Sequence, residues 1–155
     1  MNTKITKAVR TAVALASFMS AGMANAFVLN EDLGNAASST DVWKIVCPAS
    51  VDPAFNTASV RANITDMANV MLPPLMPLTI FKGGFAITTT DPVDALQGGV
   101  SLPSPTVTLV QGSGTYYINI AHTQAGSEAY AASGECQNQF GVPLAATSVV
   151  LVQDQ

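Results

Sequence analysis

Residues 114–122 read GTYYINIAH, and this stretch decides the fold class. Tyr116, Ile118 and Ile120 fall on one side of an extended chain, while Tyr117 and Asn119 fall on the other. Strict alternation of this kind is typical of a β-strand with one buried face and one solvent face. We therefore expect a strand here, with Tyr116 in the core and Tyr117 outside it.

The same alternation recurs on both sides of this strand. Turn residues such as Gly83-Gly84 separate the repeats, and no segment keeps a helical period. The pattern predicts an all-β fold, a single antiparallel β-sandwich of jelly-roll or immunoglobulin-like type. Residues 110–115 are expected to form a hairpin. The other expected strands are 41–47, 58–65, 78–82, 106–110 and 129–137, with weaker ones at 27–29, 85–88 and 144–153.

The chain has two cysteines, Cys47 and Cys136. Cys47 shares a strand face with Trp43 and Ile45, and Cys136 shares one with Tyr130. If both are core faces, the two sulfurs can meet inside the sandwich. We expect a disulfide; a metal or redox pair is the alternative, disfavoured by the wide spacing and the lone histidine.

The N-terminus has the three parts of a secretory signal peptide. A basic segment with Lys4, Lys7 and Arg10 precedes the short apolar run 11–19, and Ala24-Asn25-Ala26 is a small-residue cleavage pattern. The expected division is therefore a signal peptide at 1–26 and one domain at 27–155; a short membrane anchor that stays attached is the alternative. No transmembrane segment is expected in the mature chain, which would be periplasmic, extracellular or on the cell surface.

Removal of the signal makes the chain more acidic than its full-length net charge of −4. Lys44, Arg61 and Lys82 remain against ten acids, a net charge of 3 − 10 = −7. Three scattered cations cannot neutralise a phosphate backbone, so nucleic acid is excluded as an expected partner. A protein or a carbohydrate at the cell surface is expected instead, and the oligomeric state is left open.

Few residues suggest chemistry. His122 is the only histidine and ends the 114–122 strand, but no Gly-x-Ser-x-Gly motif accompanies it. We expect no catalytic residues and treat His122 and Tyr117 as candidate ligand contacts. Asp91 and Asp94 could contribute oxygens to Ca²⁺, the one cofactor considered; the alternative places Asp91 in a turn before Pro92 and Asp94 in solvent.

Two stretches together resemble a known family. Residues 41–45, DVWKI, are similar to the opening strand of bacterial pre-peptidase C-terminal domains. Residues 114–120, GTYYINI, followed by 126–130, resemble the closing pair of strands of those domains. The resemblance implies a jelly-roll-like sandwich without catalytic residues. This chain departs from the family pattern in its cysteine pair and in lacking an attached enzyme.

The leading functional expectation is an exported, non-catalytic binding or surface-associated domain, whose ligand could be a glycan, an envelope protein or a Ca²⁺-dependent surface. The alternative is a structural subunit of an extracellular fibre. In that case residues 27–29 or 147–152, both apolar and terminal, would pair with the sheet of a neighbouring subunit.

Overall fold

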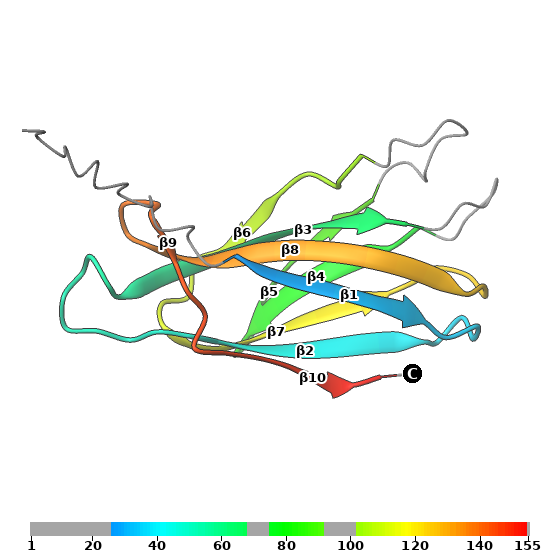
Figure 1. The fold of residues 1–155 in the computed structure, drawn as a ribbon, viewed down its shortest axis with the longest axis horizontal. Coiled ribbons are helices and arrows are strands. Elements are labelled where there is room, and N and C mark those ends of the chain that lie inside the picture. Colours follow the sequence, from blue (N-terminus) through cyan, green and yellow to red (C-terminus); the bar gives the residue numbers. More distant parts are fainter. Residues whose placement is uncertain (1–25, 68–74, 92–101, 155) are drawn as a thin grey trace, which may run out of the picture.

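The computed structural model describes residues 26–67, 75–91 and 102–154. These residues form two antiparallel β-sheets that pack together as a sandwich, as the alternation predicts (Figure 1). The described residues contain no helix, so none of them forms a helix that could cross a membrane.

The first sheet has the order β1-β8-β3-β6, and the short β9 pairs with β8 on the same side as β1. All its pairs are antiparallel. Its strands are β1 (Phe27–Leu33), β3 (Thr57–Asp66), β6 (Val107–Leu109), β8 (Glu128–Asn138) and β9 (Pro143–Leu144).

The second sheet has the order β10-β2-β7-β4-β5, again antiparallel throughout. The 114–122 stretch becomes its central strand β7, which explains the strictness of its alternation. The strands are β2 (Thr40–Cys47), β4 (Pro77–Lys82), β5 (Phe85–Thr90), β7 (Gly114–Ala121) and β10 (Ser148–Gln153).

The core lies between the two sheets and is built from alternate residues of each strand. Tyr116, Ile118 and Ile120 of β7 have no solvent exposure, as predicted from their parity. They meet side chains from the facing sheet such as Val60 and Ile64 of β3, which are also fully buried. Interdigitation of two such faces is the ordinary source of stability in a sandwich.

The predicted disulfide is confirmed. Cys47 at the end of β2 is bonded to Cys136 of β8, with 5.8 Å between their Cα atoms. The bond joins the two sheets across the interior, because β2 and β8 belong to different sheets. Strand parity therefore placed both sulfurs correctly.

The expected hairpin at residues 110–115 is wrong. β6 pairs with β3 in the first sheet, whereas β7 pairs with β2 and β4 in the second, so the loop between them crosses from one sheet to the other. Gly112 and Gly114 have φ values of 70° and 108°, and that glycine-permitted backbone makes the crossing. The expected strand at 144–153 is also interrupted, because it forms β9 and β10.

A chain of polar side chains is buried at the end of the sandwich away from the disulfide. Trp43 Nε1 donates a hydrogen bond of 2.8 Å to Tyr130 Oη, which donates one of 2.7 Å to Asp41 Oδ2. Asp41 is fully buried and Tyr130 is 2% exposed. Burial, with the nearby Asp41 carboxylate, raises the pKa of Tyr130 well above its usual range, so the phenol stays neutral.

Candidate functional site

His122 is buried and turned toward the backbone. It is 5% exposed, and its Nε2 lies 2.5 Å from the carbonyl oxygen of Ala36. Within the described residues Nδ1 has no hydrogen-bond partner, and no Ser or Thr hydroxyl is recorded against the ring. The position of His122 gives it a structural contact with the 34–39 loop.

Of the two aspartates in the predicted calcium site, the structure describes only Asp91. Asp91 is 2% exposed, and its Oδ2 accepts a hydrogen bond of 2.6 Å from the backbone N–H of Asp66. Asp94 lies outside the described residues. Among residues 26–67, 75–91 and 102–154, no cluster of three His, Cys, Asp or Glu side chains could hold a metal ion. The Asp91 and Asp94 site stays a prediction.

Tyr117 lies on the outer face of the second sheet, opposite the core. Its ring stacks on Phe81 of β4, with 5.4 Å between the ring centroids and 17° between their planes. The register places Phe81 directly across from Tyr117 on the neighbouring strand. Tyr117 is therefore half-buried by a second aromatic side chain that sequence spacing did not connect with it.

One end of the sandwich gathers four connections, and we call it the loop end. Strand register places there residues 48–56, 83–84, 110–113 and 139–142, since Cys47 is opposite Gly114 and Thr57 is opposite Asn138. Figure 1 shows the connection between β2 and β3 reaching furthest from the sheets, beside the connection between β8 and β9. Loops gathered at one end of a sandwich are a common place for binding sites.

Asn138 fixes two of these loops at once. Its Nδ2 donates a hydrogen bond of 2.8 Å to the carbonyl of Ala54, and its Oδ1 accepts bonds of 2.9 Å from the N–H groups of Phe140 and Val142. The side chain is only 4% exposed. One buried amide thus ties the 48–56 loop to the 139–142 loop.

The 48–56 loop is also organised internally. Asp52 Oδ1 accepts a bond of 2.9 Å from the N–H of Ala54, and Asn56 Oδ1 accepts one of 3.0 Å from the N–H of Ser50. These are local side-chain to backbone bonds that fix a loop without regular structure. The loop presents its tip as an ordered surface.

Lys82 holds the third loop, 110–113. Its ammonium donates hydrogen bonds to the carbonyl oxygens of Gln111, at 2.9 Å, Gly112, at 3.2 Å, and Ser113. It also lies 4.5 Å from the centroid of the Tyr116 ring, in cation–π geometry. Burial lowers the pKa of Lys82. The ammonium group of this partly exposed lysine is therefore bonded to the loop.

Large apolar side chains project from three loops of this end and from Phe85, the first residue of β5. Each of these side chains is more than half exposed and lies on backbone that hydrogen bonds or strand pairing hold in place: Val51 at 105%, Phe55 at 63%, Phe85 at 60%, Val110 at 67%, Phe140 at 68% and Val142 at 52%. A cavity of about 300 Å³ lies at this end, and Val51 is the one of these six side chains that lines it, together with residues such as Gly112 and Gln139. Exposed apolar groups gathered in this way mark interaction surfaces.

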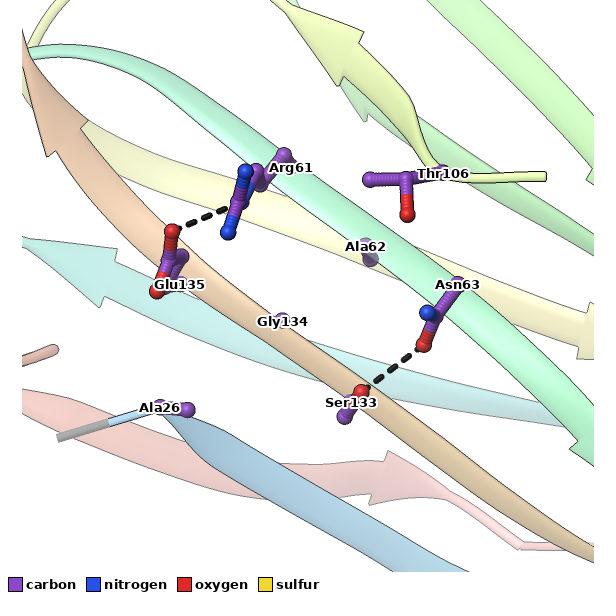
Figure 2. A pocket seen from close by; sticks show the side chains of 8 residues that line it. All are labelled: Ala26, Arg61, Ala62, Asn63, Thr106, Ser133, Gly134 and Glu135. Carbon is purple, nitrogen blue, oxygen red and sulfur yellow. Dashed lines mark hydrogen bonds and ion pairs between the residues drawn. The ribbon is translucent and has the colours of Figure 1, made fainter. Parts of the chain in front are cut away.

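A second, polar depression lies on the outer face of the first sheet (Figure 2). It has a volume of about 230 Å³ and is formed mainly where β3 runs beside β8. Arg61 Nε lies 2.6 Å from Glu135 Oε1, and Ser133 Oγ donates a hydrogen bond of 2.7 Å to Asn63 Oδ1. The remaining lining residues include Ala26 and Thr106 at its margins.

Gly134 shapes the strand beneath this depression. A Cβ atom there would lie 2.6 Å from the ring of Phe27 and 2.6 Å from the carbonyl oxygen of Arg61. The absent side chain lets the Phe27 ring pack against β8 on the core side. β1 is thereby seated against the sheet, and Ala26 reaches the margin of the depression.

Sequence reasoning singled out neither surface. The six exposed apolar residues of the loop end are spread from position 51 to position 142, and only the strand register brings them to one end. Arg61 and Asn63 alternate along β3 with the buried Val60, Ala62 and Ile64, so both point outward. Their partners on β8 could not be assigned without the register.

Comparison with known proteins gives no relative for this arrangement. No family model, no curated protein and no solved structure matches the chain. The resemblance to pre-peptidase C-terminal domains therefore stays a prediction.

Proposed function

We propose that this chain is an exported, non-catalytic binding domain that engages a protein partner through its loop end. One observation carries the proposal: large apolar side chains on three loops and at the first residue of β5, three of them phenylalanines, are exposed at one end of the sandwich, on backbone that hydrogen bonds hold in place. Exposing them costs free energy in water, and that cost is recovered when a partner covers them.

The chemistry of the loop end favours a protein over a glycan or a metal-dependent surface. Three of its six exposed apolar residues are phenylalanines, and aromatic side chains are enriched at the centres of protein interfaces. Its charged side chains are few: Asp52 bonds within its own loop, and Lys82 caps carbonyl groups. A partner with an apolar, weakly charged surface fits best.

Export is part of the proposal and has two supports. The Cys47–Cys136 disulfide is a bond that oxidising compartments maintain. The first strand, β1, begins at Phe27, directly after the small-residue pattern that ends at Ala26. An N-terminal sequence of the secreted protein that begins at Phe27 is the expected result, and retention of residues 1–26 would contradict it.

Site-specific photo-crosslinking tests the docking role. Phe55, Phe85 and Phe140 are replaced one at a time by p-benzoylphenylalanine, and the exporting cells are irradiated. The control places the same probe at Tyr117, on the outer face of the second sheet. One discrete adduct from the loop-end positions, absent from the control, is expected. No adduct, or the same adduct from position 117, would overturn the proposal.

Assembly into a fibre is a second candidate, favoured by the position of the terminal strands. β1 and β10, the first and last strands, lie at sheet edges, and each pairs with one neighbour within the described residues. Edge strands at chain ends are the elements that subunits exchange. However, Phe27 and Leu29 are buried in the core of their own chain, so exchange would require β1 to leave its sheet.

Size-exclusion chromatography separates the two candidates. Full-length mature protein is compared with variants that lack residues 27–33 or residues 147–155. Concentration-dependent multimers that disappear on removal of either end support the fibre. A monomer in every case removes it and leaves the loop-end proposal standing.

A further inference from the structure

We propose that the depression on the outer face of the first sheet is a binding site for a neutral saccharide. The site is separate from the loop end and stands without it. It is built from two cross-strand pairs, Arg61 with Glu135 and Asn63 with Ser133, which the register places next to one another on β3 and β8 (Figure 2).

The hydrogen bonds recorded in the site leave both donors and acceptors for a ligand. The ion pair uses Nε of Arg61, so both terminal amino groups of the guanidinium keep their N–H donors within the described structure. The two recorded contacts of Glu135, from Arg61 and Gln137, both go to Oε1, which leaves Oε2 as an acceptor. Asn63 uses Oδ1 and keeps two Nδ2 donors.

The net charge of the site and of the chain disfavours an anionic ligand. The guanidinium of Arg61 is compensated by the Glu135 carboxylate at 2.6 Å, so the site has no net charge. The rest of the chain carries an excess of acids, which repels anions. A phosphate, sulfate or uronate would have to compete with Glu135 for the guanidinium.

The lining also decides against a metal ion and an apolar molecule. Glu135 is the only carboxylate among the eight lining residues, whereas Ca²⁺ takes six to eight oxygens. The side chains that face the depression are mostly polar. Val28 of β1, directly opposite Ser133 and 60% exposed, adds an apolar flank. Hydroxyl groups that both donate and accept, on a ring with apolar C–H faces, meet all these conditions.

The test begins with purified, oxidised protein on an array of neutral, uronate-bearing and sulfated oligosaccharides. Binding to neutral oligosaccharides is expected. The strongest neutral oligosaccharide is then titrated by calorimetry against the Asn63→Ala/Ser133→Ala double variant, with an expected loss of at least tenfold in affinity. Both residues lie on the outer face, so thermal unfolding should be nearly unchanged.

The chain offers a matched control. Thr79 and Thr88 form a comparable hydrogen-bonded cross-strand pair on the outer face of the second sheet, with 2.8 Å between their Oγ1 atoms. Thr79→Ala/Thr88→Ala should bind the oligosaccharide as tightly as the parent. Binding only to charged oligosaccharides, no binding on the array, or equal losses in the two double variants would each overturn the proposal.

Glu135→Gln tests the charge argument separately. The substitution keeps the length of the side chain but leaves the Arg61 guanidinium uncompensated. Sulfated oligosaccharides are expected to gain affinity for this variant relative to neutral ones. An unchanged preference would overturn the role assigned to the ion pair. Loop-end variants such as Phe140→Ser should leave saccharide binding intact, so failure of one proposal is distinguishable from failure of the other.

Discussion

The two ends of the sandwich interior are held together by different chemistry. At the loop end, a covalent bond between Cys47 and Cys136 joins the sheets. At the opposite end, the hydrogen-bonded chain of Trp43, Tyr130 and Asp41 spans the same gap. Large apolar side chains are exposed at both ends, for example Met67 and Leu102 at the polar end, whereas the exposed phenylalanines Phe55, Phe85 and Phe140 all lie at the covalent end.

Of the changes at the two ends, removing the disulfide should cause the largest loss in the free energy of unfolding. The Cys47→Ala/Cys136→Ala variant opens a covalent loop of 90 residues, from a sequence separation of 89. Chain-entropy reasoning gives a loss of about 4–5 kcal/mol in the free energy of unfolding. Urea denaturation measures it. A loss below about 1 kcal/mol would mean that the polar end alone sustains the sandwich.

Removing the central hydroxyl of the polar chain should cost less. Tyr130→Phe deletes one buried acceptor for Trp43 Nε1 and one buried donor to the Asp41 carboxylate. A loss of about 2–3 kcal/mol in the free energy of unfolding is expected, because buried bonds to charged groups are among the stronger ones. Tyr117→Phe, whose hydroxyl has no recorded hydrogen bond in the described structure, is the matched control. Equal effects would contradict a special role for the polar chain.

Lys82 stabilises a surface loop at the loop end, and removing its charge should have a smaller effect on stability. Lys82→Met removes the ammonium that caps the carbonyl oxygens of the 110–113 loop. A loss of about 1–2 kcal/mol is expected from these bonds. Hydrogen exchange should also quicken at Gly112, whose N–H donates to the carbonyl of Ala58. Lys44→Met, on the outer face of the second sheet, should have neither effect.

Much of the framework follows from sequence alternation, because one buried face imposes a period of two on every strand. The predicted disulfide rested on the presence of two cysteines and was supported by the parity of Cys47 and Cys136. Parity does not say which strand lies beside which. The glycine-rich segment before β7 therefore indicated a hairpin, although its glycines carry the chain between sheets. The pairing of Phe81 with Tyr117 depends on the same missing information.

Polar burial was the second limit. Asp41 shares a face with Ile45 and Cys47, and an acid at such a position contradicts the alternation rule. Its burial depends on Tyr130, 89 residues further along the chain. Likewise, Asn138 follows the last predicted residue of its strand and looks like an ordinary turn residue. Its role in holding two loops depends on contact with Ala54, 84 residues away.

Alkaline pH should lower the free energy of unfolding through the polar end and not through the disulfide, and this effect should be small. Burial raises the pKa of Tyr130 in the folded protein above the value of about 10 in the unfolded chain. The stability linked to this phenol is fully present below pH 10 and is lost as the pH rises toward the folded-state pKa, because the unfolded chain ionises first. At pH 11 the loss should be about 1.4 kcal/mol from the unfolded-state ionisation alone.

The Tyr130→Phe variant lacks this phenol, whereas the disulfide does not titrate. The difference in unfolding free energy between parent and variant should therefore narrow by that amount between pH 8 and pH 11. A constant difference across this range would mean that Tyr130 ionises as readily in the folded protein as in the unfolded chain, and that the polar end is open to water.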